Sequence, residues 1–239
     1  QAIPDFPPKS PAPTRRPVLL VHGFVCNRGL WNPWMQQLSA AGVPFVAVNL
    51  EPVFGSIDAY VPTIEAAMRQ LELPSSHKPL VVAHSMGGLA VRAWLCERGS
   101  EARVHGVVTI GSPHAGTALA RAGFSRNARQ MRQGSRWLQA LQAKETPQRR
   151  SLFTCYYGHC DNIVVPASTG MLGGADNRHI PGVAHVHLVF QPQVLADVLA
   201  RTARSDTAIP RRSRAARTSP PSRARDLVAF SELTILLRI

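Results

Sequence analysis

Apolar residues along this chain gather in short uninterrupted runs, and longer segments of helical spacing separate the runs. A strand that is apolar over its whole length is typical of a sheet covered on both faces, because neither side of the strand meets water. Strands separated by helices also favour parallel pairing. We therefore expect an α/β fold with a mostly parallel central sheet and helices on both faces. The five predicted strands are 18–22, 44–50, 80–84, 104–110 and 152–157.

The segments between these runs predict the helices. Apolar side chains recur on one side of residues 57–73, and Pro62 falls in the first turns, where a missing N–H is tolerated. The positions on this side are Ile57, Tyr60, Val61, Ile64, Met68 and Leu71. Further helices are expected over 31–41, 87–98 and 188–203. The alternation runs from residue 17 to residue 203, a length that suits one domain with a sizeable core.

Residues 117–150 interrupt the alternation, and we interpret them as an insertion over the sheet. Within them, residues 127–142 are predicted to form one basic amphipathic helix. The candidate apolar residues of this helix are Met131, Trp137, Leu138 and Leu141.

The two ends of the chain differ from its body in composition. Residues 1–16 are rich in proline and polar residues and predict an extended linker. Residues 204–239 are rich in Arg, Ser and Pro without an apolar period, so we expect a basic, disordered tail. The chain begins at Gln1, and we expect a processed or truncated product whose signal peptide or membrane anchor would lie upstream. No apolar stretch approaches the length of a transmembrane helix.

The formal net charge of +13 would suit a nucleic-acid-binding protein if it were spread over the whole fold. It is concentrated instead in two segments. Residues 121–150 carry +7 and residues 201–239 carry +6, which leaves the rest of the chain formally neutral. A neutral body with two basic patches does not fit a general nucleic-acid-binding protein, so no nucleic-acid partner is expected.

The four cysteines allow three full pairings, and their spacing does not choose among them. Cys155 and Cys160 could pair locally around a turn, whereas free buried thiols fit the sequence equally well. The remaining two are Cys26 and Cys96.

A serine lies where the third predicted strand meets the next helix. Residues 80–88 read L-V-V-A-H-S-M-G-G, with Ser85 at the junction. A sharp, strained turn at such a junction lifts the serine hydroxyl above the edge of the sheet. Strand and helix crowd each other there, so small residues are needed two positions before and after the serine. Ala83 and Gly87 meet this need, with alanine where glycine is usual. Ser85 is therefore the predicted nucleophile.

A negatively charged intermediate on this serine needs two backbone N–H donors. Met86 supplies the first, because it directly follows the nucleophile. Phe24 is the candidate for the second, in the H-G-F sequence after the first strand, where Gly23 allows a tight turn. His22 is interpreted as a structural hydrogen-bonding residue of this loop rather than a catalytic one.

The order of the remaining catalytic residues follows the nucleophile. In this arrangement an acid comes after the serine and a histidine comes last. Asp161 lies in G-H-C-D-N-I-V-V-P after the fifth strand, and His185 lies in I-P-G-V-A-H before the last helix. We expect His185 to take the proton of Ser85 and Asp161 to fix the imidazole tautomer and stabilise its charged form.

Other residues compete for these positions. Asp176 lies in a G-G-A-D-N sequence and is interpreted as a turn residue. His187 could be the base, but it begins the predicted helix, so His185 is preferred. His84 occupies the variable position of the turn. His114 and His159 are interpreted as polar loop residues near the site.

No metal site or cofactor is expected. A set made of His159, Asp161, Asp176 and His179 is conceivable, but these residues show no recognised ligand spacing.

Five short motifs, taken together, resemble bacterial lipases and esterases of the α/β-hydrolase superfamily. The alanine before the nucleophile is similar to that of small bacillus-type lipases, and the third motif resembles that of pseudomonas- and burkholderia-type triacylglycerol lipases. The motifs are V-H-G-F, A-H-S-M-G-G, G-S-P-H-A-G-T, C-D-N-I-V-V-P and G-V-A-H, within residues 17–203.

The resemblance implies an α/β-hydrolase catalytic domain over 17–203 that cleaves carboxylic esters through an acyl-enzyme. It implies Ser85, Asp161 and His185 as the triad and Phe24 and Met86 as oxyanion donors. It also implies an ester or lipid substrate, no organic cofactor, and a secreted or periplasmic enzyme, either free or tethered by an upstream segment. Larger relatives carry a structural calcium, but no matching second aspartate is present, so calcium is not carried over.

Several alternatives stay open at this point. Residues 117–150 could act as a lid or wall that contacts a lipid interface through 121–150, or could pack permanently on the domain. An acyltransferase or a polyester depolymerase would use the same triad. A non-catalytic binding module would not need the intact catalytic set, and a nucleic-acid or membrane-binding protein would depend on the tail 204–239. Acyl-chain preference and oligomeric state are not predicted.

Overall fold

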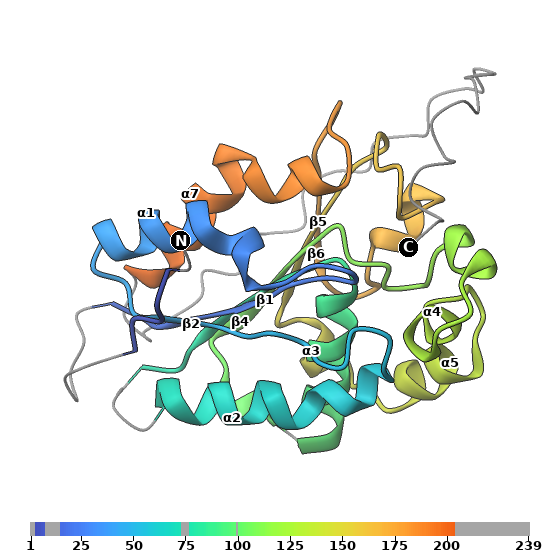
Figure 1. Ribbon diagram of the computed structural model, residues 1–239, viewed down its shortest axis with the longest axis horizontal. Helices are drawn as coiled ribbons and strands as arrows, with labels where there is room; N and C mark the ends of the chain where they lie inside the picture. The colour runs from blue at the N-terminus through green and yellow to red at the C-terminus, as the bar shows by residue number, and fades with distance from the viewer. Residues whose placement is uncertain (1–2, 8–14, 73–76, 99, 204–239) are drawn as a thin grey trace. The chain divides into compact units, whose positions relative to one another are not determined.

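A computed structural model describes residues 3–7, 15–72, 77–98 and 100–203. Six strands form one sheet in the order β2-β1-β3-β4-β5-β6, and every neighbouring pair is parallel (Figure 1). The predicted parallel sheet is therefore confirmed. The strands are β1 (Val18–Val21), β2 (Phe45–Ala47), β3 (Leu80–His84), β4 (Gly106–Ile110), β5 (Phe153–Tyr157) and β6 (Asp176–His179).

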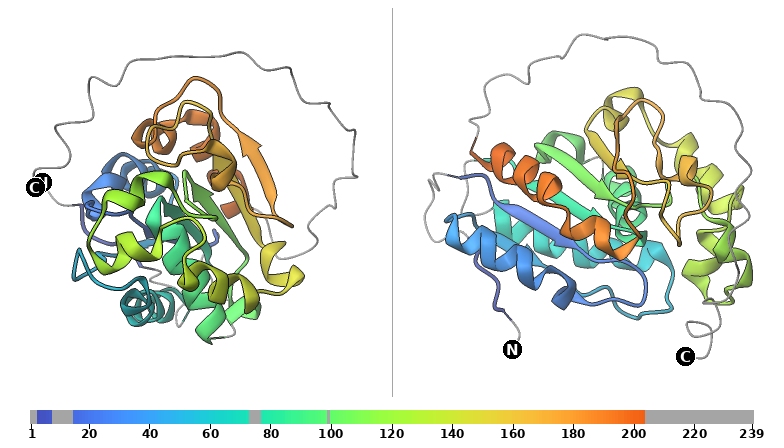
Figure 2. Two further views of the ribbon diagram at one scale, coloured as in Figure 1. Left: turned by 90° about the vertical axis from the view of Figure 1, so that its right-hand side faces the viewer. Right: turned by 90° about the horizontal axis from the view of Figure 1, so that it is seen from above.

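Helices cover both faces of this sheet. One face packs against α2 (Val61–Glu72) and α3 (Met86–Arg98), and the other packs against α1 (Asn32–Ala40) and α7 (Pro192–Thr202). Seen from above, α1 and α7 lie side by side over this face of the sheet (Figure 2). Short 3₁₀ helices are η1 (Arg28–Trp31), η2 (Ile57–Tyr60), η3 (Ser100–Arg103), η4 (Ala118–Ala122), η5 (Ala167–Gly170) and η6 (Val186–Phe190).

The two cores explain why the strands are apolar throughout. Successive side chains of a strand point to opposite faces of the sheet. Leu19 and Val81 accordingly belong to the core under α2 and α3, whereas Leu20 and Val82 belong to the core under α1 and α7. All four side chains are fully buried.

The insertion between β4 and β5 differs from its prediction. The single helix expected over 127–142 is wrong, because the structure has α4 (Arg126–Gln130) and α5 (Arg136–Ala143). Gly134, in the link between them, has φ of +67°, a conformation through which a right-handed helix cannot continue. Ser135 then starts α5, its side chain accepting a hydrogen bond from the Leu138 N–H. A further helix, α6 (Pro147–Arg150), leads into β5.

Two other boundaries also differ. The last helix was expected from residue 188, but α7 begins at Pro192, because proline fits the first turn and cannot continue a helix from before it. Asp176, expected in a turn, opens the edge strand β6 instead. This strand is polar because much of it faces solvent, so the apolar pattern did not reveal it.

The N-terminal residues that the structure describes contact the sheet rather than extending away from it. The Phe6 N–H donates to the Phe45 carbonyl over 3.0 Å, and the Phe45 N–H donates back over 2.7 Å. The Asp5 carboxylate accepts hydrogen bonds from Arg28 and from the Ala47 N–H. The linker prediction did not anticipate these contacts. Residues 8–14 and the predicted tail 204–239 lie outside the described residues.

The described residues also bear on membrane-spanning helices and on the state of the cysteines. No helix there is long and apolar enough to cross a membrane. All four cysteines are free thiols in this structure, with Cys155 buried and Cys160 exposed.

Candidate active site

Ser85 occupies a strained turn between β3 and α3. Its φ is +53°, a left-handed conformation that residues other than glycine rarely adopt. The Ser85 N–H donates to the Ile110 carbonyl at the end of β4 over 2.9 Å, which ties the turn to the neighbouring strand. Gly87 allows α3 to pass close to β1. A Cβ added there would lie 2.5 Å from the carbonyl oxygen of His22.

The H-G-F loop lies directly against this turn. A Cβ added at Gly23 would lie 2.7 Å from the Cβ of Ser85, so only glycine fits there. The Phe24 N–H donates to no acceptor among the residues that the structure describes. Met86 is the first residue of α3, so its N–H has no earlier helical carbonyl to bind. These two N–H groups lie at the loop and the turn that border Ser85.

His22 fixes this loop. Its Nδ1–H donates to the Gly23 carbonyl over 2.8 Å, and its Nε2 accepts from the Leu50 N–H over 3.0 Å. Burial lowers the pKa of His22, although the Gly23 carbonyl and the charge of Glu51 oppose the shift. These contacts agree with the structural role expected for His22.

Asp161 and His185 form a buried pair at the same edge of the sheet. The Nδ1 of His185 lies 2.8 Å from Oδ2 and 3.0 Å from Oδ1 of Asp161. The Ile163 and Val164 N–H groups donate to the Asp161 carboxylate, each over 2.8 Å. The His185 N–H donates to the side chain of Asn162 over 3.2 Å. With Nδ1 donating to the carboxylate, Nε2 of His185 keeps its lone pair and can accept a proton.

The ends of three neighbouring strands bring the predicted catalytic residues together. The rings of His185 and His84, the residue before Ser85, have centroids 4.7 Å apart. Gly111, at the end of β4, has φ of +58°, and a Cβ there would lie 3.1 Å from Nδ1 of His185. No hydrogen bond joins Ser85 to His185 in the described part of the chain. Such bonds are often long without substrate and shorten in the bound complex.

The rival residues differ from the Asp161–His185 pair in burial or in contacts. Asp176 is exposed and accepts a hydrogen bond from Arg178 over 2.9 Å. His187 is exposed in η6. His84 is buried, and neither ring nitrogen has a hydrogen-bond partner among the described residues. Burial, followed by the charge of His185, lowers the pKa of His84 well below its usual value.

His114 lies in the loop that follows β4, as its sequence position predicts. His114 is buried, and its Nε2 lies 2.9 Å from the Thr109 hydroxyl in β4. Its backbone carbonyl accepts from Arg92. Burial, with the charge of Arg92, lowers the pKa of His114 well below its usual value.

The four residues considered as metal ligands do not gather at one point. Asp161 is bound to His185, and Asp176 lies at the opposite end of β6 from His179. His159 and His179 alone come together, with Nδ1 and Nε2 2.5 Å apart. Within the described ranges, no group of three or more potential ligands surrounds a common point.

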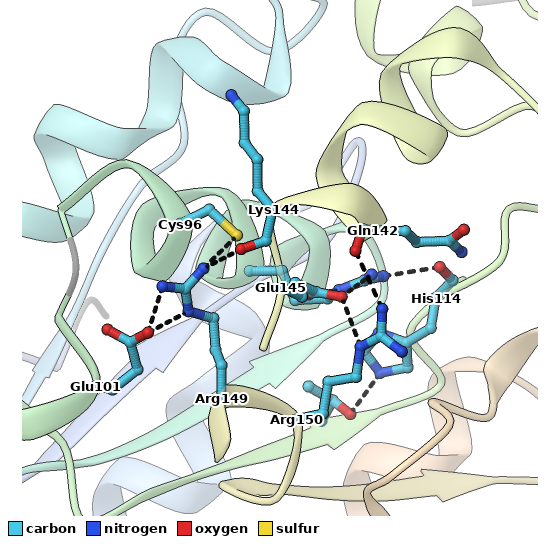
Figure 3. Close-up of polar contacts among 10 residues, drawn as sticks. Cys96, Glu101, His114, Gln142, Lys144, Glu145, Arg149 and Arg150 are labelled. Carbon is cyan, nitrogen blue, oxygen red and sulfur yellow. Dashed lines mark hydrogen bonds and ion pairs between the residues drawn. The ribbon is translucent and has the colours of Figure 1, made fainter. Parts of the chain in front are cut away.

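The C-terminal half of the insertion is anchored to α3 (Figure 3). Arg92 donates to both carboxylate oxygens of Glu145, over 2.6 and 2.8 Å, and both side chains are fully buried. Arg149 forms an ion pair with Glu101 and donates to the Cys96 thiol over 3.0 Å. These contacts hold α5 and α6 against α3.

Large exposed apolar side chains lie on the segments that follow the ends of the parallel strands. The carboxyl ends of parallel strands meet at one edge of a sheet, which is the edge that carries Ser85. Phe124 in the insertion is the most exposed, at 83 %. The full set is Val25, Phe54, Phe124, Val165, Met171, Val186 and Phe190. The segments around the candidate site therefore expose apolar surface.

Sequence reasoning did not assign roles to two residues that position the site. Gly111 makes room for the His185–Asp161 pair, and Asn162 holds the backbone of His185. Gly111 is the first residue of the G-S-P-H-A-G-T motif, so the sequence could have drawn attention to it. The contact with His185 could not be predicted from the sequence.

Comparison with known proteins places these observations in context. The sequence profile described as alpha/beta hydrolase fold matches residues 16–179. No curated protein sequence matches the chain.

Many solved structures resemble this one at low sequence identity. A Bacillus licheniformis lipase in its mature form is 19% identical, with a TM-score of 0.66 over 81% of this chain and 95% of its own. Aspergillus fumigatus lipase B is 19% identical, with a TM-score of 0.69 over 82% of this chain and 55% of its own. A Paleococcus ferrophilus monoacylglycerol lipase is 15% identical, with a TM-score of 0.55 over 78% of this chain and 96% of its own. At these identities the likeness establishes the fold.

Proposed function

Because this chain belongs to the α/β-hydrolase fold family, we propose that it is a serine hydrolase that cleaves carboxylic esters. The observation that carries the proposal is the buried Asp161–His185 hydrogen bond beside the strained turn of Ser85. A buried carboxylate that orients an imidazole next to an activated serine is the arrangement used for acyl transfer. The lipases that share the fold supply ester hydrolysis as the reaction by analogy.

In this proposal Ser85 attacks the acyl carbon of the ester. Nε2 of His185 takes the hydroxyl proton as the oxygen–carbon bond forms, and then gives it to the departing alcohol. Asp161 accepts the Nδ1–H throughout and stabilises the imidazolium. The N–H groups of Phe24 and Met86 would bind the negative oxygen of the intermediate. Water, activated by His185 in the same way, then releases the acid and restores the serine.

The main test is hydrolysis of p-nitrophenyl esters of increasing acyl length. Ser85→Ala should lower kcat/KM by at least about 1,000-fold at every length, because the nucleophile is lost. Ser112→Ala is a matched control, since Ser112 is buried and its hydroxyl has no partner among the described residues. The control should keep activity within a few-fold. Equal activity of Ser85→Ala and wild type would remove the proposal.

An acyltransferase or a polyester depolymerase would use the same residues. The exposed apolar side chains near the site favour an apolar acyl substrate but not one acceptor over another. Adding an alcohol to the same assay distinguishes an acyltransferase from a hydrolase, because acyl transfer yields a new ester and hydrolysis yields the acid. The predicted secreted or periplasmic location stays a prediction.

We also propose that the first half of the insertion contacts a lipid surface. Phe124 is flanked by Arg121, Arg126 and Arg129, all exposed and without ion pairs among the described residues. An exposed aromatic side chain among cations is suited to an interface with anionic lipid. The anchored second half, by contrast, would act as a fixed wall rather than as a moving lid.

Vesicle binding tests this surface. Replacing Arg121, Arg126 and Arg129 with Gln should weaken binding to vesicles of anionic phospholipid and slow hydrolysis of emulsified ester, with little change on soluble ester. A control with Arg136→Gln and Lys144→Gln removes two exposed cations from α5 and its C-terminal end. Equal losses in both variants, or on both substrates, would contradict the lipid contact.

A further inference from the structure

Two histidines converge at the end of the sheet beside the candidate site. His159 follows β5, and His179 ends β6, the neighbouring strand. Nδ1 of His159 lies 2.5 Å from Nε2 of His179, and the His159 backbone N–H lies 3.4 Å from the same Nε2. Both side chains are exposed, and the ring of Tyr157 lies beside both. Two ring nitrogens therefore face one point that solvent can reach.

We propose that His159 and His179 together bind one divalent transition-metal ion, such as Zn²⁺, Ni²⁺ or Cu²⁺. Imidazole nitrogen is a preferred ligand for these ions. Zinc lies about 2.0–2.1 Å from a histidine nitrogen, so two tetrahedral ligands stand roughly 3.3 Å apart. The two nitrogens need to separate by about 1 Å to admit an ion, and exposed side chains can rotate that far. Without a metal, the two ring nitrogens are joined directly by a hydrogen bond.

Water is expected to complete the coordination. Asp161 is engaged by His185 and two backbone N–H groups, and Asp176 pairs with Arg178. Two imidazoles and water make a weaker site than the four protein ligands of a structural zinc site.

The ion would join two strand ends next to the catalytic acid. His159 lies two residues before Asp161, so a metal bridge to His179 would tie the start of the Asp161 loop to β6. The metal site does not depend on ester hydrolysis. Ser85→Ala should bind the metal as the wild type does, so the two proposals can fail separately.

Isothermal titration of the full chain with Zn²⁺ and with Ni²⁺, near pH 7.5 and in a buffer without chelator, tests the site. The wild type should bind one ion, and EDTA should reverse it. His159→Ala and His179→Ala should each weaken binding by about tenfold or more, since each removes one ligand. His187→Ala is the matched control, because His187 is exposed and pairs with no second histidine among the described residues. This variant should bind as the wild type does.

Three results would overturn the proposal. One is no binding to the wild type. Another is equal binding by the wild type and both alanine variants, with circular dichroism showing that the variants are folded. The third is a loss of binding in Cys160→Ser with no loss in His159→Ala or His179→Ala, because the exposed thiol rather than the histidine pair would then hold the ion.

Discussion

Neighbouring backbone constrains Ser85, in the turn after β3, and Gly87, in the first turn of α3. Ser85 keeps a positive φ although it is not a glycine, and its N–H is fixed by Ile110. Gly87 is required for a different reason, because the carbonyls of Val21 and His22 occupy the space where a side chain would begin. Strain of this kind persists only where the surrounding structure holds it in place.

Replacing Gly87 with alanine tests this contact. The new Cβ would lie 2.5 and 2.8 Å from two backbone oxygens of the β1 end, which cannot rotate away. We expect Gly87→Ala to lower the free energy of unfolding by about 2–4 kcal/mol, more than the roughly 1 kcal/mol that alanine gains in a helix. Gly173→Ala, where nothing lies within 4 Å, should change it by less than about 0.5 kcal/mol in the same urea titration. Equal effects would contradict the steric argument.

The sequence allowed each candidate catalytic residue to be proposed separately, but it did not reveal the contacts among these residues. Ser85 was recognisable because its turn imposes small residues at fixed spacing. Asp161 and His185 followed from the order of strands and loops. The contact of Gly111 with His185 could not be predicted, because it depends on which strand ends are neighbours in space.

At the scale of elements, a buried ion pair fixes the insertion. The side chains of Arg92 in α3 and Glu145 after α5 are both fully buried, and two hydrogen bonds join them. Removing one partner from such a pair leaves an uncompensated buried charge, which costs far more than losing an exposed pair.

Glu145→Ala should therefore lower the free energy of unfolding by about 3–5 kcal/mol. Glu97→Ala is the matched control, because the Glu97–Arg98 pair is half exposed and 3.7 Å long, and should cost less than about 0.5 kcal/mol. Replacing Arg92 with Met together with Glu145 with Leu should recover much of the loss, because no buried charge remains. Thermal unfolding of the wild type, the two alanine variants and the double variant tests this prediction. Equal stability of Glu145→Ala and Glu97→Ala would refute the anchoring role.

The elements whose side chains are buried were those that the sequence predicted well. β3 matches its prediction residue for residue, since every position of Leu80–His84 is buried. β6 was missed because Asp176–His179 carries exposed polar side chains. The break between α4 and α5 was missed because apolar residues keep their helical spacing across Gly134, although the backbone turns there.

At the scale of the whole molecule, buried histidines set how stability depends on pH. Burial lowers the pKa of His84 and of His114 well below the usual value. The unfolded chain binds a proton at each of these residues near pH 6.5, while the folded chain does not. The free energy of unfolding therefore decreases as the pH falls below about 6.5. Each residue contributes a slope of up to about 1.4 kcal/mol per pH unit.

Urea unfolding at pH 7.5, 6.5 and 5.5 measures this slope. We expect a loss of stability from pH 6.5 to 5.5, and a smaller loss in His84→Phe, which has no imidazole to protonate when unfolded. His187→Ala, at an exposed position, should keep the wild-type slope. Equal stability of the wild type at pH 7.5 and 5.5 would contradict the prediction.

Glu65 affects the stability of the protein in a different, more acidic pH range. Burial raises its pKa, but hydrogen bonds from Arg103, Trp94 and Arg69 outweigh burial and lower it to about 2. A lowered carboxyl pKa gives stability that is present above the unfolded value of 4.5 and is lost as the pH falls towards 2. The loss between pH 6.5 and 5.5 therefore belongs to the histidines.

The bridge between Phe6 and Phe45 has a consequence for self-association. A strand at the border of a sheet offers unpaired N–H and C=O groups to which another chain can add. Phe6 occupies such groups on β2, and at the opposite border β6 is short and carries charged side chains. Both borders are thus poor templates for pairing with a second molecule. Removing residues 1–7 would open the β2 border and make aggregation depend on protein concentration.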